Sequence, residues 1–224
     1  MINLKEIKKY ILVLPTNKDR LNNANYIKSN IFNDLEIKYV INSEFDKFAY
    51  ENIINTLPDI QTTIWEDLLP HYRKIQEYSC ALETYRIIKE AYLLGYDNIL
   101  YLEDDAKIEN LNLIQEFLNH APQNFDLLKL GYWNGNVKTF QYEDYGIKLY
   151  KEKNIYWIPS NDMPRYCNLA NIYSRTGMEK YIKFQDKNLA LGDLWTYIIN
   201  DDKKYISTIS LVNQINTVSS IQYT

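Results

Sequence analysis

The sequence predicts an α/β fold in which helices flank a sheet, and two observations support this prediction. Short apolar runs of strand type alternate with segments whose apolar residues recur at helical spacing, which is the pattern of a layered α/β architecture. The chain has 224 residues, 46% of them hydrophobic, which is enough to build a sizeable core. Because no repeat or low-complexity linker interrupts the chain, we expect a single domain over residues 1–224.

Five apolar runs predict strands, and turn-forming or polar residues end most of them. Pro15 stops the first run, the polar segment Asn42–Glu44 closes the second, and Gly131 follows the fourth. In chain order, the predicted strands are Tyr10–Leu14, Glu36–Ile41, Asn98–Leu102, Phe125–Leu130 and Leu169–Tyr173.

Helical spacing of apolar residues predicts the elements between these strands. The clearest pattern lies between Arg73 and Leu94, and Gly95 follows it where a helix commonly ends. The predicted helices are Asn17–Asn30, Arg73–Leu94, Asn112–His120, Thr176–Phe184 and Asp193–Asn200. Residues Tyr132–Ser160 are less regular, and we expect a hairpin around Tyr145–Gly146. The tail beyond Ser210 shows little regular pattern.

The most informative segment is the third strand, because it ends in three consecutive acids, Glu103, Asp104 and Asp105. Adjacent like charges repel, and a partly desolvated strand end strengthens the repulsion, so a cation usually offsets it. A hard divalent cation with oxygen ligands would do so. Ligands of open α/β sheets sit beyond the carboxyl ends of the strands, where these acids fall. A solvated acidic turn is the alternative.

Charge and cysteine content argue against several other functions. The net charge is −4 with a pI near 5.3, and no basic run could follow a phosphate backbone, so we expect no nucleic-acid partner. Cys80 and Cys167 form neither a CxxC pair nor a disulfide framework. No apolar stretch is long enough for a membrane span. We expect a cytoplasmic protein, free or peripheral at a membrane, and in the host cytoplasm if the chain is viral.

Five segments together resemble the ordered landmarks of glycosyltransferase family 25, the lipopolysaccharide-type glycosyltransferases. These segments are Tyr78–Leu82, Ile99–Asp105, Phe125–Gly131, Asn171–Gly177 and Gly192–Asp193. The resemblance implies a GT-A fold, which is a Rossmann-like mixed sheet flanked by helices. It also implies a nucleotide-sugar donor, most commonly a UDP-sugar, a glycan acceptor, Mn²⁺ or Mg²⁺, and usually inversion at the anomeric carbon. Glu83 and Thr84 stand where the family often has a Ser-His pair.

The resemblance also suggests roles for individual residues. Residues 1–110 would bind the nucleotide sugar, and residues 111–224 would bind the acceptor and carry the catalytic group. Asp105 would bind the metal directly, Glu103 would face the ribose or a metal-bound water, and Asp104 would support the cation or contact donor hydroxyls. Further donor-binding candidates are Pro15, Thr16, Arg20, Asn42, Ser43 and Ser79. Of these, Arg20 could reach a phosphate. As alternatives to donor binding, Arg20 could lie on an exposed helical face, and Ser79 could pack within its helix.

An inverting transfer needs a base for the acceptor proton, and Asp193 is the leading candidate. Asp193 could instead cap the helix that follows it; Glu66 and Asp162 are the next acids to consider. His71 and His120 have no metal-ligand spacing. Two other functions stay open: a nucleotidyltransferase, although residues 15–20 contain no glycine, and a non-catalytic carbohydrate-binding protein that stacks sugars on its aromatic residues.

Overall fold

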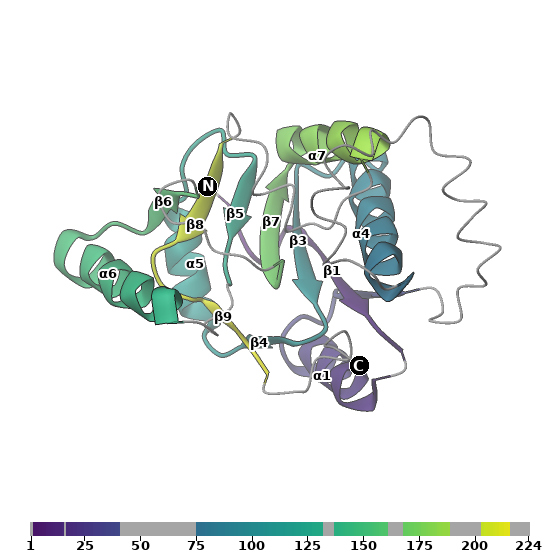
Figure 1. Cartoon of the computed structure of the whole chain (residues 1–224), viewed down its shortest axis with the longest axis horizontal. Coiled ribbons are helices and arrows are strands. Elements are labelled where there is room, and N and C mark those ends of the chain that lie inside the picture. Colours follow the sequence, from purple (N-terminus) through teal and green to yellow (C-terminus); the bar gives the residue numbers. More distant parts are fainter. Residues whose placement is uncertain are drawn as a thin grey trace.

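The computed structural model describes residues 2–15, 17–40, 75–131, 137–160, 168–188 and 203–215. The strands in these ranges are β1 (Lys8–Val13), β2 (Glu36–Tyr39), β3 (Asn98–Glu103), β4 (Ala106–Ile108), β5 (Leu127–Lys129), β6 (Trp157–Pro159), β7 (Ala170–Ser174), β8 (Lys204–Ser207) and β9 (Val212–Gln214). The helices are α1 (Lys18–Asn30), α4 (Ile75–Leu93), α5 (Leu111–Asn119), α6 (Val137–Lys153) and α7 (Arg175–Asn188). Figure 1 shows their arrangement.

Seven of these strands form one mixed sheet in the order β2-β1-β3-β7-β5-β8-β6. Strand β1 pairs in parallel with β2 and with β3, and β5 pairs in parallel with β8. Strand β7 runs antiparallel between β3 and β5, and β6 runs antiparallel beside β8. The two remaining strands, β4 and β9, form a separate antiparallel pair. The predicted Rossmann-like α/β fold with a mixed sheet is therefore confirmed.

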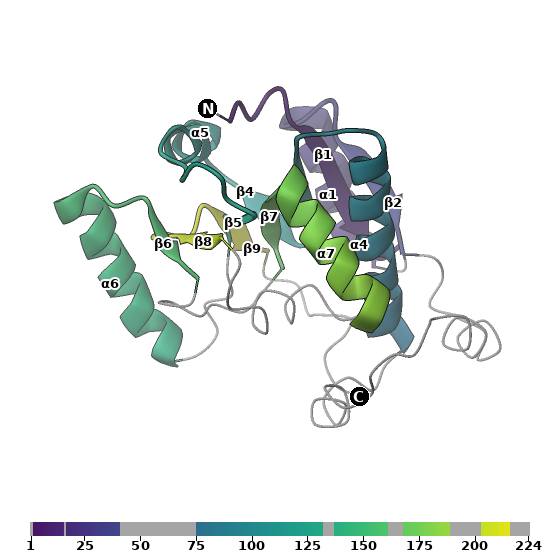
Figure 2. The same cartoon turned by 90° about the horizontal axis from the view of Figure 1, so that it is seen from above.

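Helices cover both faces of the sheet and create two apolar cores (Figure 2). The core under α1 and α5 contains Ala24 and Ile27 from α1 and Phe117 from α5. The core under α4 and α7 contains Ile88 from α4 and Tyr181 from α7. Because both faces are covered, the central strands are nearly continuous apolar runs rather than alternating ones, as the buried residues 10–13 of β1 show.

The region between β5 and β6 differs from the prediction. The prediction of a hairpin around Tyr145–Gly146 is wrong, because these residues lie within helix α6. Glycine is a weak helix former and reads as a turn signal. Here tertiary packing outweighs that preference: Gly146 and Leu149 are buried, and the Tyr150 ring lies 5.0 Å from the Phe117 ring of α5.

Three short strands carry no strong sequence signal and were not predicted. Strands β4, β6 and β9 have only three residues each, too few to show an alternating pattern. Strand β8 has four residues and was also not predicted. The predicted helix Asp193–Asn200 lies outside the described residues. Within the described ranges, no helix is long and apolar enough to cross a membrane.

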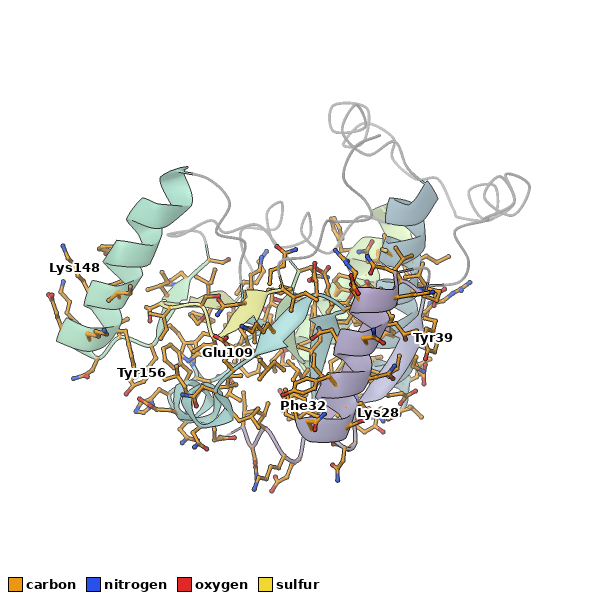
Figure 3. The ribbon with its side chains drawn as sticks, turned by 90° about the horizontal axis from the view of Figure 1, so that it is seen from below. Lys28, Phe32, Tyr39, Glu109, Lys148 and Tyr156 are labelled. Carbon is orange, nitrogen blue, oxygen red and sulfur yellow. The ribbon has the colours of Figure 1, made fainter. Side chains whose placement is uncertain are left out.

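An aromatic cluster joins α5 to the end of α6 and to β6. Tyr156, labelled in Figure 3, stacks on His120 with ring centroids 3.9 Å apart. The hydroxyls of Tyr150 and Tyr156 both donate to Glu116 of α5, at 3.1 and 3.2 Å. His120 thus takes part in packing on this side of the molecule.

Helix α7 approaches the start of β5 so closely that only glycine fits at position 177. A Cβ atom added to Gly177 would lie 1.8 Å from the backbone oxygen of Asp126. Gly95 presents a different case, because its φ of +84° favours glycine while the space around it is open.

We expect Gly177→Ala to lower the free energy of unfolding by about 3 kcal/mol, because the helix must move away from the sheet. Gly95→Ala, the matched control, should cost only about 1 kcal/mol of backbone strain. Urea unfolding of both variants measures the two losses. Equal losses would show that α7 can shift to admit the methyl group.

Candidate functional site

The carboxyl ends of β1 and β3 mark the place where the strand order of the sheet reverses. From β1 the chain crosses to β2 on one side, and it returns through α4 to β3 on the other side of β1. Ligands of open α/β sheets bind at such a switch point, outside the carboxyl ends of the strands. The exposed Pro15 follows β1 here, and the acids Glu103, Asp104 and Asp105 follow on β3 and its turn. We take this edge as the candidate site.

Arg20 of α1 lies between two of these acids. Its Nη1 atom is 2.7 Å from Asp104 Oδ1, and its Nη2 atom is 3.0 Å from Asp105 Oδ2. The helix begins just before it, with the Asn17 side chain accepting from the Arg20 amide at 3.2 Å. The three charged residues are only 3–6% exposed. This differs from the predicted contact between Arg20 and a donor phosphate, because the buried acids already bind the guanidinium.

Asp104 is fully engaged in holding the β1–α1 loop. Its Oδ2 atom accepts from the Leu14 amide at 2.8 Å, while Oδ1 receives Arg20. Burial raises the pKa of Asp104, and the charge of Arg20 and the Leu14 hydrogen bond oppose that rise only in part. Burial alone would lower the pKa of Arg20, but Asp104 and Asp105 outweigh it, so that pKa is raised and the guanidinium stays charged. Each carboxylate oxygen of Asp104 therefore has one partner within the fold, and its contact with a cation or donor hydroxyl stays a prediction.

Asp105 is held from two directions. Its Oδ2 atom accepts from Gln214 Nε2 of β9 at 2.7 Å and forms an ion pair with Arg20 Nη2 at 3.0 Å. Its backbone oxygen accepts from the Ile215 amide at 2.8 Å. The Oδ1 atom, in contrast, is buried and has no hydrogen-bond partner among the described residues, and the same is true of Arg20 Nε. An unsatisfied buried acceptor is costly, so Oδ1 needs a partner such as a water molecule, a cation or a closer approach of Arg20 Nε.

Glu103 lies on the other face of the strand from Asp104. Side chains alternate along a strand, so Glu103 shares a face with Tyr101, which belongs to the core under α4 and α7. The Tyr101 hydroxyl is 2.9 Å from Thr84 Oγ1. Burial chiefly, and the Glu103 charge in addition, raise the pKa of Tyr101 far above its usual value. The half-buried Glu103 carboxylate therefore faces α4, while Asp104 and Asp105 face α1 and β9.

The residues present could hold a divalent cation only if few of its ligands come from the protein. Among the described residues, no three His, Cys, Asp or Glu side chains gather to hold a metal ion. Among the described residues of the buried cluster, Asp105 Oδ1 is the carboxylate oxygen without a hydrogen-bond partner. Mg²⁺ commonly binds through one or two carboxylates, with water and substrate phosphates completing the shell. The donor set fits that kind of site rather than a closed protein cage.

Several predicted residues lie outside the described part of the chain. These are Thr16, Asn42, Ser43, Glu66, His71, Asp162 and Asp193; Ser79 lies in α4, but its side chain is not described. Their roles stay predictions.

Two residues at the site were not predicted. Asn23 lies three positions after Arg20 on the same face of α1, and its Nδ2 atom donates to the backbone oxygens of Asp104 and Ala106 at 2.9 and 2.8 Å. Its helical spacing from Arg20 was a usable signal. Gln214 lies in a segment without periodicity, so no sequence signal pointed to its contact with Asp105.

No protein-family model matches the chain, and no curated protein matches it. Among solved structures, the chain is similar to A197 from STIV, with a TM-score of 0.38 and 12% sequence identity, over 91% of this chain and 81% of that chain. A likeness of this extent supports no inference about function, which is therefore drawn from the geometry of the site.

We expect Arg20→Leu to lower the free energy of unfolding by about 3–5 kcal/mol at pH 7, because it leaves buried carboxylates unpaired. Loss of the guanidinium should raise the already raised pKa of Asp104 further. A folded state with the higher pKa binds more protons than the unfolded state, so the loss should shrink as the pH falls from 7 to 5.

Urea unfolding at both pH values measures this effect. Lys28→Leu is the control, because Lys28 is an exposed cation on the same helix (Figure 3), and its removal should cost less than about 1 kcal/mol. A loss in Arg20→Leu that is independent of pH would contradict the assigned pairing with Asp104.

Proposed function

We propose that this protein is a glycosyltransferase of the GT-A class that moves a sugar from a nucleotide-sugar donor to a glycan hydroxyl. The observation that carries the proposal is the position of Glu103, Asp104 and Asp105 at the switch point of an open mixed sheet. Such an edge is where this architecture binds nucleotides. The resemblance of five ordered segments to glycosyltransferase family 25 supports the same function.

In this proposal, Asp104 stabilises the fold, and Asp105 and Glu103 contact ligands. Asp104 and Arg20 hold the β1–α1 loop against the end of β3, so the loop that would meet the nucleotide is fixed in place. Asp105 Oδ1 would hold a divalent cation, Mn²⁺ or Mg²⁺, and Glu103 would face the ribose or a water on the cation. When bound, the cation stabilises the negative charge that develops on the departing nucleoside diphosphate.

The acceptor hydroxyl must lose a proton during an inverting transfer, and a carboxylate is a usual base. We propose Asp193 for this role on the strength of the sequence resemblance alone. The base would act on the acceptor, while Pro15 and the end of β1 lie on the donor side.

A thermal-shift panel tests the function. The protein is heated with UDP-sugars, UDP and ADP, each with and without Mn²⁺, since a ligand that binds only the native state raises its apparent stability. We expect a Mn²⁺-dependent shift with uridine nucleotides and a smaller one with ADP. Release of free nucleoside diphosphate without acceptor separates an enzyme from a carbohydrate-binding protein. No shift with any nucleotide sugar would contradict the proposal.

We expect Asp105→Asn to weaken Mn²⁺-dependent donor binding at least about tenfold, or about 1.4 kcal/mol. Asp104→Asn is the matched control, because it also removes a charge beside Arg20 but its two oxygens are already engaged. It should lower thermal stability and leave the Mn²⁺ dependence of binding unchanged. Calorimetry of both folded variants measures the affinities. If Oδ1 of Asp105 is satisfied by Arg20 Nε instead of by a cation, the two variants will bind Mn²⁺ and donor equally well.

Asp193→Asn should reduce transfer by about 10²–10⁴-fold and leave nucleotide-sugar affinity nearly intact, because a general base acts on the acceptor proton. If Asp193 only caps a helix, Asn is an equally good cap and activity should barely change. Turnover and donor affinity are measured on the same preparation. Transfer within about threefold of the parent would remove Asp193 from the mechanism and direct attention to Glu66 and Asp162.

A further inference from the structure

We infer that Glu83 and Arg86 of α4 bind the edge of the donor's base, and that they select bases in which a ring N–H group lies beside a carbonyl group. Uracil and guanine have such an edge, whereas cytosine and adenine do not. The inference rests on the proposed function and names the residues that would choose the nucleotide. It requires no metal ligand, because the base lies apart from the phosphates.

Glu83 and Arg86 form an ion pair one turn apart on α4. Arg86 Nη1 donates to Glu83 Oε1 at 2.5 Å. The other carboxylate oxygen, Oε2, has no hydrogen-bond partner among the described residues, and unlike Asp105 Oδ1 it is not fully buried. The Arg86 side chain is 48% exposed and the Glu83 side chain 11%. The pair therefore offers a ligand one acceptor oxygen and, beside it, a guanidinium with further N–H donors.

Helical periodicity places Glu83 at the carboxyl edge of the sheet. Glu90 lies two turns after Glu83 on the same face of α4, and it pairs with Lys38 of β2 at 2.8 Å. Because α4 leads into the start of β3, its earlier residues lie nearer the carboxyl ends of the strands. Two turns rise about 10 Å, and β2 ends one residue after Lys38. Glu83 therefore lies beyond the end of β2.

The packing of α4 agrees with this position. Ile87, one turn further along the helix, packs in the same core as Leu14 and Val40, which directly follow β1 and β2. Glu83 is thus the next side chain of this face past the ends of both strands. It is 8% exposed, and glutamate is rarely buried to this extent without a partner.

A nucleotide bound across the switch point would extend from the end of β3 to this ion pair. In the sheet, β1 separates β3 from β2, so the ends of β3 and β2 are about 10 Å apart. The proposed function places the diphosphate at the end of β3. The ribose can connect the diphosphate to a base over the end of β2, and the base would then lie beside α4.

The hydrogen-bonding chemistry of the pair matches one kind of base edge. A carboxylate oxygen only accepts hydrogen bonds, and a guanidinium only donates them. Glu83 Oε2 would accept from the ring N–H of uracil or guanine, and Arg86 would donate to the adjacent carbonyl oxygen. The corresponding ring nitrogen of cytosine or adenine has a lone pair instead, which the carboxylate would repel. A site that hydrogen-bonds one group rejects analogues that lack it.

Calorimetric titration with UDP, GDP, CDP and ADP, each with Mn²⁺, tests the inference. We expect the parent to bind UDP or GDP roughly tenfold or more tightly than CDP and ADP, as a hydrogen bond to a charged group allows. Tighter binding of UDP would identify uracil as the base, and tighter binding of GDP would identify guanine. The diphosphate and any metal are common to all four ligands, so the ratio of affinities depends on the base.

Glu83→Gln keeps the shape of the side chain and replaces one acceptor oxygen by an NH₂ donor, which suits the ring nitrogen of cytosine. We expect the preference for UDP or GDP over CDP to fall roughly tenfold or more. A purely structural role would lower the unfolding temperature and leave this ratio unchanged.

Glu90→Gln is the matched control, because Glu90 lies on the same face of α4 and pairs with Lys38 instead. It should keep the ratio of the parent. If Glu83→Gln does not fold, Arg86→Met at the half-exposed partner is titrated in its place. Loss of the donor to the base carbonyl should likewise reduce the preference for UDP or GDP.

The outcomes separate the inference from the proposed function. If the parent prefers UDP or GDP and Glu83→Gln keeps that preference, the role of Glu83 is overturned while the function stands. A parent that binds the four nucleotides equally, or that prefers CDP or ADP, also overturns the inference. If the parent binds none of them, the proposed function fails, and the inference fails with it.

Discussion

The ion pairs of Arg20 with Asp104 and Asp105 determine how the candidate site is built. Burying three charged side chains carries a large desolvation cost, which is offset only when the partners meet in good geometry and additional hydrogen bonds satisfy them. The Leu14 amide and Gln214 provide such bonds, and Asn23 binds the backbone of the same turn. One guanidinium therefore joins the first helix to the turn after β3, and Asp105 extends the connection to β9. The position of the acids depends on this pairing rather than on the strand alone.

These ion pairs change the interpretation of the three consecutive acids Glu103, Asp104 and Asp105. Electrostatic repulsion by itself suggests that all three carboxylates bind an external cation. In the structure an internal cation already offsets part of the charge, and each oxygen of Asp104 has a partner within the fold. Among the described residues of this cluster, one carboxylate oxygen, Asp105 Oδ1, is buried without a hydrogen-bond partner. Under the proposed function, a cation at this edge would need further oxygen ligands, which a nucleoside diphosphate would provide.

The sequence predicted the parts of the fold that local chemistry specifies. Strands β1, β3, β5 and β7 are continuous apolar runs because both faces are covered, and breakers such as Pro15 mark their ends. The position of the acids at a strand end was predictable for the same reason. The ion pair of Arg20 was not, because it joins residues 84 positions apart. Helix α6 was missed because Gly146 has a local preference that only packing against α5 overrides, and Gln214 was missed because β9 is too short to show a period.

The long-range contacts also explain why the site cannot be assigned to one half of the chain. Asp105 belongs to residues 1–110, which were predicted to bind the donor, but its orientation depends on a residue 109 positions later. Strands β2, β1 and β3 of residues 1–110 and strands β7, β5, β8 and β6 of residues 111–224 form one continuous sheet, joined where β3 pairs with β7. Closing such distant contacts costs chain entropy before it brings any stabilisation. The contact between Asp105 and Gln214 therefore forms only when β9 lies beside β4.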